Sequence, residues 1–156
     1  MAKKKTTRKK ITRRVVDKKR DAVTTGKIKG LAEGVVKSSL AQREPNFDIP
    51  TRSVSNMRYN KRRRILEMGD ATQTRSLFNL GQARKFMQSL LLAKGCHDLI
   101  DAEKTLSLRG MYYMALHTIE GTGEKTFDDQ GESDSILEDL EVALDGLREE
   151  LHVFAK

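Results

Sequence analysis

A chain of 156 residues is long enough for one domain with a modest core, and its 37% hydrophobic and 33% charged residues exclude a membrane-embedded protein. Its single cysteine, Cys96, cannot form an internal disulfide and no secretion signal is visible, so we expect a cytoplasmic protein. Of the 30 lysines and arginines 27 precede Glu120, whereas 12 of the 22 acidic residues lie from Glu120 onward, which favours a basic region that contacts a polyanion.

Residues 1–24 are predicted to form a disordered basic arm, because like charges repel and few apolar side chains offset the entropy of ordering. Contact with DNA phosphates by counterion release would make binding strongly dependent on salt and independent of base sequence. The candidate DNA-binding residues of this arm are Lys9, Lys10, Arg13 and Arg14. A solubilising or targeting tail is the alternative that the same composition leaves open.

Residues 25–50 are predicted to hold a helix that docks on a partner, followed by a linker. Apolar side chains recur at the helical period over residues 25–40, at Ile28, Leu31, Val35, Val36 and Leu40. Three glycines in this stretch weaken the helix by roughly 1 kcal/mol each relative to alanine, so we expect it to form against a partner chain. Pro45 and Pro50 then favour an extended connection over residues 44–53.

A basic hairpin is predicted after this linker. Residues 54–59 and 64–68 have the composition of two short strands joined by a turn, with Tyr59, Leu66 and Met68 facing inward. Its arginines, together with one just before it, are candidate contacts to DNA phosphates: Arg52, Arg58, Arg62, Arg63 and Arg64. An exposed strand edge protected by positive charge would show the same pattern.

Helices separated by short links are predicted after the hairpin. A helix over residues 80–94 that stops at Gly95 follows from apolar side chains at the helical period, at Leu80, Ala83, Met87, Leu90 and Leu91. A helix over residues 107–120 and a glycine-rich turn over residues 121–127 then give a helix-turn-helix pattern with a wing. The sequence thus predicts a mainly α fold with a small β-hairpin, a winged-helix domain over residues 51–156 that presents the 107–120 helix to DNA.

The helix expected at residues 107–120 carries the candidate catalytic residues. Ser107 can cap its start and Gly121 can end it, and one apolar stripe should be buried, at Leu108, Met111, Tyr112, Ala115 and Ile119. Tyr113 lies outside this stripe, and Arg109 lies one turn earlier on the same flank. A phenol is a weak nucleophile at its free pKa of about 10, and a nearby guanidinium could favour the phenolate or stabilise charge on a phosphorus under attack. The alternative is a half-buried tyrosine beside a surface arginine.

No metal site is expected in this chain. The acidic residues between Asp128 and Asp134 precede a helix and match no calcium-loop spacing, so they are typical of solvated helix caps. The single cysteine and three histidines do not give a zinc site. Apolar side chains between Ile136 and Phe154 predict one long helix that closes the core.

The segments Leu108–Tyr113 and His117–Thr122 resemble the active-site region of the A subunit of archaeal DNA topoisomerase VI, a family that includes the meiotic double-strand-break protein. The resemblance covers roughly the last two-thirds of the chain, through Ile49–Ser53, Phe86–Gln88, Thr126–Asp128, Ile136–Glu141 and Leu147–Leu151. Gly110 departs from the family, which usually has an acidic residue there. Because glycine weakens a helix by about 1 kcal/mol relative to alanine, this departure bears on local rigidity.

The resemblance implies a winged-helix domain like that of the catabolite activator and a role in cleaving double-stranded DNA. By this resemblance Tyr113 attacks a phosphodiester and becomes linked to the 5′ phosphate, while Arg109 stabilises the pentacovalent transition state. Two such A subunits would cut both strands, and reversal of the transfer would reseal them.

The resemblance also implies parts that this chain lacks. In the family, Mg²⁺ is held by a Toprim domain that would begin about where this sequence ends, and ATP is bound by a B subunit in an A2B2-type assembly. We therefore expect the A-subunit half of a type IIB, ATP-dependent topoisomerase, associated with the nucleoid. This chain should not cleave DNA efficiently without a Toprim-bearing chain and the B subunit.

Two other classes of protein stay open. A non-catalytic winged-helix DNA-binding protein would use Tyr113 and Arg109 as phosphate contacts, and its binding would survive Tyr113→Phe. An assembly protein would hold Toprim or ATPase chains through its N-terminal and acidic C-terminal helices and would bind DNA weakly.

Overall fold

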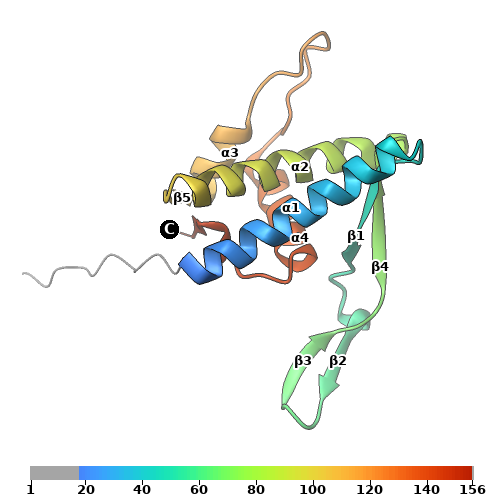
Figure 1. The fold of residues 1–156 in the computed structure, drawn as a ribbon, viewed down its shortest axis with the longest axis vertical. Helices are drawn as coiled ribbons and strands as arrows, with labels where there is room; N and C mark the ends of the chain where they lie inside the picture. Colours follow the sequence, from blue (N-terminus) through green and yellow to red (C-terminus); the bar gives the residue numbers. More distant parts are fainter. Residues whose placement is uncertain (1–17, 156) are drawn as a thin grey trace, which may run out of the picture.

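The long helix α2 is the element against which the other helices pack (Figure 1). The computed structural model describes residues 18–155, a mainly helical fold with small two-stranded sheets. Its helices are α1 Lys18–Leu40, α2 Leu80–Asp101, α3 Leu108–Ala115 and α4 Gln130–Ala143. Short 3-10 turns lie at Val54–Asn56 and Arg148–Leu151, and the strands are β1 Asn46–Pro50, β2 Met57–Asn60, β3 Ile65–Met68, β4 Thr72–Ser76, β5 Leu106–Ser107 and β6 Val153–Phe154. None of the helices within residues 18–155 has the length and apolar content needed to cross a membrane.

The core lies where α2 meets α3 and α4. Leu92 and Cys96 of α2, Met111 of α3, Leu137 of α4 and Phe127 from the preceding loop are buried together. Burying one such large apolar side chain stabilises the fold by about 1.5–3 kcal/mol. Burial also raises the pKa of the Cys96 thiol to about 12, so this thiol stays protonated at neutral pH.

The first helix, α1, lies against α2 and starts earlier than predicted. It begins at Lys18, so residues 18–24 of the predicted arm are helical, and Thr24 is buried. Near its start, the Asp21 carboxylate lies 3.1 Å from Nε2 of His152, which ties α1 to the C-terminal part of the chain. The first 17 residues lie outside the described part of the chain, and with them the arm candidates Lys9, Lys10, Arg13 and Arg14.

Strand β1 lies within residues 44–53, where an extended linker was predicted, and it forms a sheet with β4. The two strands pair antiparallel over their full length, and Ile49 is buried. Arg52 and Arg75 both pair with Asp139 of α4, and Arg52 also pairs with Glu138. These ion pairs fasten the sheet to α4.

The β2–β3 hairpin extends away from the helices (Figure 1). Its antiparallel register pairs Tyr59 with Leu66 and Met57 with Met68. The prediction that Tyr59, Leu66 and Met68 face inward is wrong, since their exposed fractions are 58%, 68% and 38%. A two-stranded ribbon buries a face only when another layer covers it, and the period of its side chains does not reveal whether such a layer exists.

The ends of three helices differ from the sequence-based prediction. α2 runs through Gly95 to Asp101, because this glycine is buried beside α3 and does not end the helix. α3 ends at Ala115, so Gly121 lies in the following loop. The long C-terminal helix ends at Ala143, because the chain reverses at Asp145, whose φ is 44°, and at the glycine that follows.

Candidate active site

The start of α3 is fixed by a side-chain cap and a strand. Gly110 donates its backbone N–H to Oγ of Ser107 at 3.1 Å, which confirms the predicted N-cap. Such a cap stabilises a helix by about 0.5–2 kcal/mol relative to alanine. Directly before α3, Leu106 pairs in parallel with Val153 of β6. The helix that carries the candidate nucleophile is therefore anchored to the C-terminal strand.

The inner face of α3 packs on α2. Met111 and Ala115 are buried as predicted, while Leu108 and Tyr112 are partly buried against the core. A Cβ on Gly95 of α2 would lie 2.6 Å from Cε of Met114, the flexible end of a side chain of α3, so Gly95 faces α3. The spacing of the sequence predicted which face of α3 is buried.

The outer face of α3 carries the two candidate catalytic side chains. Tyr113 is 56% exposed, and an Nη atom of Arg109 donates to its hydroxyl at 3.1 Å. The Arg109 guanidinium carbon lies 5.6 Å from the centre of the Tyr113 ring. The two residues therefore meet as their i, i+4 spacing predicted.

The hydrogen bond to Tyr113 raises the pKa of Arg109, since it and the attraction between the two groups favour the charged guanidinium. Tyr112 lies beside this pair, with ring centres 5.2 Å apart, but its ring is partly buried against the core. Of the two adjacent tyrosines, Tyr113 is the one with a hydroxyl next to a cation.

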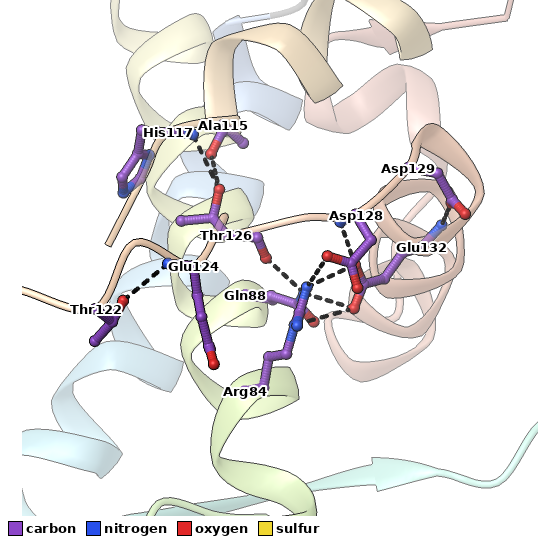
Figure 2. Close-up of polar contacts among 10 residues, drawn as sticks. All are labelled: Arg84, Gln88, Ala115, His117, Thr122, Glu124, Thr126, Asp128, Asp129 and Glu132. Carbon is purple, nitrogen blue, oxygen red and sulfur yellow. Dashed lines mark hydrogen bonds and ion pairs between the residues drawn. The ribbon is translucent and has the colours of Figure 1, made fainter. Parts of the chain in front are cut away.

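The end of α3 is held by the loop that leads to α4. Thr126 Oγ1 donates to the carbonyl of Ala115 at 2.8 Å and accepts the N–H of His117 at 3.1 Å (Figure 2). Beyond this point an isolated bridge joins Thr118 and Lys125 around a glycine-containing turn. This turn forms the loop that projects beyond α3 in Figure 1.

Two buried polar residues of this region were not identified from the sequence. Gln88 of α2 and Thr126 are both fully buried, and the Gln88 amide donates to the Thr126 carbonyl at 2.7 Å. Both residues lie in segments that resemble the topoisomerase family, Phe86–Gln88 and Thr126–Asp128, but their contact with each other was not predicted. Nothing in the chain order pointed to a contact across 38 residues.

The predicted DNA-binding arginines of the β2–β3 hairpin do not lie beside Tyr113. The hairpin that carries Arg58, Arg62, Arg63 and Arg64 is at the opposite end of the long axis from α3 (Figure 1). Arg58 lies 3.3 Å from Asp70 and Arg63 lies 3.5 Å from Glu67, in exposed pairs that a polyanion could replace.

Arg52 lies apart from the hairpin arginines, in the ion pairs with α4, where about a third of its side chain is exposed. Its carboxylate partners raise its pKa although burial opposes them. For Arg52 and the hairpin arginines alike, DNA contact stays a prediction.

The acidic loop before α4 acts as a helix cap. Asp129 Oδ1 accepts the N–H of Glu132 at 2.8 Å, and Asp128 pairs with Arg84 at 2.9 Å. Within residues 18–155, no three His, Cys, Asp or Glu side chains are grouped so that they could hold a metal ion.

Comparison of the chain with known proteins shows the family that it resembles. Residues 84–153 match the family described as Type IIB DNA topoisomerase. The A subunit of Type 2 DNA topoisomerase 6 from Pyrococcus horikoshii is 42% identical over 129 residues, which cover 83% of this chain and 34% of that protein. The same subunit from Methanothermobacter thermautotrophicus is 39% identical over 132 residues, 85% of this chain and 36% of that protein.

A third relative extends the match. The A subunit of Type 2 DNA topoisomerase 6 from Hyperthermus butylicus is 35% identical over 146 residues, 89% of this chain and 37% of that protein. This chain thus spans about a third of the length of these relatives. Most of its residues, including both ends of α3, lie within these matches, and the chain therefore belongs to the type IIB DNA topoisomerase family.

Proposed function

We propose that Tyr113 is the nucleophile with which this chain cleaves double-stranded DNA as part of a type IIB topoisomerase. The observation that carries the proposal is the exposed Tyr113 hydroxyl, 3.1 Å from the guanidinium of Arg109. The helix below them is capped at its start and held at its end, so the hydroxyl has a defined position. A defined position lowers the entropic cost of reaching the transition state.

The proposed step is a transesterification. The Tyr113 oxygen attacks the phosphorus of a DNA phosphodiester, the bond from phosphorus to the deoxyribose O3′ breaks, and the proton lost by the phenol is balanced by one gained at O3′. One phosphodiester replaces another, so no water is consumed, and attack by O3′ on the phosphotyrosine reseals the strand. Arg109 stabilises the charge that develops on the phosphoryl oxygens.

We infer that α2, α3 and the loop over residues 116–127 act as a winged-helix unit that presents α3 to DNA. The short link between α2 and α3 and the projecting loop after α3 support this assignment. The arginines of the β2–β3 hairpin and the N-terminal basic residues would contact phosphates farther along the same duplex. Such contacts position DNA without reading its sequence.

Further parts of the reaction belong to partner chains in this proposal. In the family that the chain resembles, Mg²⁺ is held by a Toprim domain, so we assign Mg²⁺ to a Toprim-bearing chain. ATP is assigned to a B subunit, in an A2B2-type assembly that works on the nucleoid. In that assembly the transient double-strand break would allow strand passage and relaxation of supercoils.

Covalent capture tests this proposal. Labelled duplex DNA is incubated with Mg²⁺, ATP, a Toprim-bearing chain and the B subunit from the same source, together with the wild-type chain, Tyr113→Phe or Tyr112→Phe. A denaturing gel then separates free DNA from DNA linked to protein. We expect an adduct on 5′ ends with the wild type and with Tyr112→Phe, and none with Tyr113→Phe.

Two results would contradict the assignment. An adduct that persists in Tyr113→Phe would place the nucleophile elsewhere. Absence of any adduct, with DNA binding that survives in both variants, would favour a non-catalytic DNA-binding protein, and weak DNA binding with tight association of the partner chains would favour an assembly protein.

A further inference from the structure

The buried amide of Gln88 on α2 forms hydrogen bonds with the loop after α3 and with the start of α4 (Figure 2). Its Nε2 donates to the carbonyl of Thr126 at 2.7 Å and to Oε1 of Glu132 at 2.8 Å. Because both neighbours are acceptors, only the amide nitrogen can face them, and the orientation of the amide is fixed. Gln88 thereby links α2 to the loop after α3 and to the first turn of α4.

Thr126 carries this link to the end of α3. The carbonyl of Ala115 is among the last four of the helix, which have no partner within the helix. The Thr126 hydroxyl donates to that carbonyl at 2.8 Å, and its backbone N–H donates to the carbonyl of His117 at 2.9 Å. Ala115, the last residue of α3 and two residues after Tyr113, is therefore joined to the loop by the fully buried side chain of Thr126.

The first turn of α4 completes the connection. Glu132 receives the Gln88 amide on one carboxylate oxygen and the N–H of Asp128 on the other, at 2.9 Å. Arg84, one turn before Gln88 on α2, lies 3.4 Å from the same carboxylate. The capped start of α4 is thus the fixed base from which Gln88 and Thr126 reach α3.

We infer that Gln88 and Thr126 are positioning residues for Tyr113: they hold the C-terminal end of its helix and the loop after it as one rigid body. The inference rests on the proposed function, because a positioning role has meaning only if Tyr113 reacts. It explains why polar side chains, and not apolar ones, fill this part of the interior. Neither residue touches DNA in this proposal. They set where the Tyr113 oxygen lies relative to a phosphate that the loop and helix bind together.

Thr126→Val and Thr126→Ser form the matched pair that tests this inference. Valine keeps the shape but removes the hydroxyl, so Ala115 and His117 lose their partner, whereas serine keeps the hydroxyl. In the assembled complex at saturating DNA, we expect Thr126→Val to slow adduct formation by about 10- to 100-fold, since a misplacement near 1 Å has effects of that order. The dissociation constant for DNA should stay within about twofold, and Thr126→Ser should form adduct within about threefold of the wild-type rate.

Gln88→Met extends the test to the other member of the chain, because methionine matches the length of glutamine but donates no hydrogen bond. It should slow adduct formation as Thr126→Val does, while Gln73→Met on the exposed strand β4 leaves the rate unchanged. Hydrogen exchange of the full chain supplies a readout without catalysis. The Leu116 N–H, bonded to the Tyr112 carbonyl, should exchange faster in Thr126→Val than in Thr126→Ser.

Three outcomes would overturn the inference. A wild-type adduct rate in Thr126→Val would show that the hydroxyl does not position Tyr113, while the proposed nucleophile would stand. Equal losses of rate and DNA affinity in both Thr126 variants would indicate a general structural role. Absence of adduct from the wild-type chain itself would instead overturn the proposed function, and the inference with it.

Discussion

Tyr113 and Tyr59 are exposed to nearly the same extent, 56% and 58%, yet they lie in very different surroundings. Tyr113 stands on a helix that is capped at one end, held at the other and packed on the core, with a guanidinium at its hydroxyl. Tyr59 stands on a two-stranded ribbon opposite the exposed Leu66. Exposure alone therefore does not distinguish a candidate nucleophile from a surface phenol. The two tyrosines differ in how firmly their backbone is held and in whether a cation lies at the hydroxyl.

The core below α3 should be far more sensitive to truncation than the hairpin. Leu92→Ala removes a fully buried side chain and should lower the free energy of unfolding by about 2–5 kcal/mol. Leu66→Ala, at a 68% exposed position, should change it by no more than about 0.5 kcal/mol. Urea denaturation measures both values, and equal effects would mean that the hairpin is buried against something in solution.

Loss of an ion pair should likewise lower the free energy of unfolding more in the core region than near the hairpin. Asp139→Asn weakens the partner of Arg75, whose buried side chain is 5% exposed, and should cost about 1–3 kcal/mol of stability. Burial lowers the pKa of Arg75 although Asp139 opposes the shift, so this guanidinium depends on its carboxylate partner. Asp70→Asn removes the exposed partner of Arg58 and should cost about 0–1 kcal/mol.

Salt separates these two ion pairs further. Adding salt should reduce the effect of Asp70→Asn and leave that of Asp139→Asn nearly unchanged, because exposed pairs are screened more strongly than buried ones. Denaturation of both variants at low and high salt measures the difference. A strongly salt-dependent effect of Asp139→Asn would show that water reaches the Arg75 pair.

Removing the N-cap of α3 should lower stability less than the changes above in the core region. Ser107→Ala leaves the Gly110 N–H without its acceptor and should lower stability by about 1 kcal/mol. Ser55→Ala, near the hairpin, removes only an exposed hydroxyl contact to Ser53 and should be nearly neutral. Thermal denaturation compares the two, and a neutral Ser107→Ala would mean that β5 and β6 alone fix the start of α3.

The sequence predicted the parts of the site that depend on neighbours one helical turn apart. The Ser107 cap, the burial of Met111 and the Arg109–Tyr113 contact all follow from local spacing, and the structure confirms them. Helix ends were less predictable. Gly95 has the composition of a stop, but its effect depends on whether another helix packs against it.

Long-range contacts account for the rest. Gln88 and Thr126 are 38 residues apart, and each alone is an ordinary polar residue in the sequence. Arg52 was predicted as a phosphate contact from its charge, while its partners Glu138 and Asp139 lie more than 80 residues later. Charge patterns indicate that a basic residue will find an anion, and only the fold identifies the anions of this chain.

The hairpin should affect DNA binding without affecting stability. Arg62→Gln and Arg64→Gln remove two exposed charges at its turn, so the free energy of unfolding should change by less than about 0.5 kcal/mol. If both arginines contact phosphates, the slope of log affinity against log salt concentration should fall by about 0.9 for each charge removed. Arg43→Gln, an exposed change outside the hairpin, is the matched control and should leave the slope unchanged.

The same double variant also distinguishes the role of the hairpin from the role of α3. Because the hairpin lies at the opposite end of the long axis from α3, its arginines can strengthen binding only by reaching DNA beyond the cleavage point. At saturating DNA the variant should therefore form adduct at the wild-type rate, while Tyr113→Phe forms none at any DNA concentration. Slower adduct formation at saturating DNA, with unchanged affinity for DNA, would show that the hairpin acts on the chemical step. DNA binding by the hairpin and cleavage by α3 would then not be separate functions.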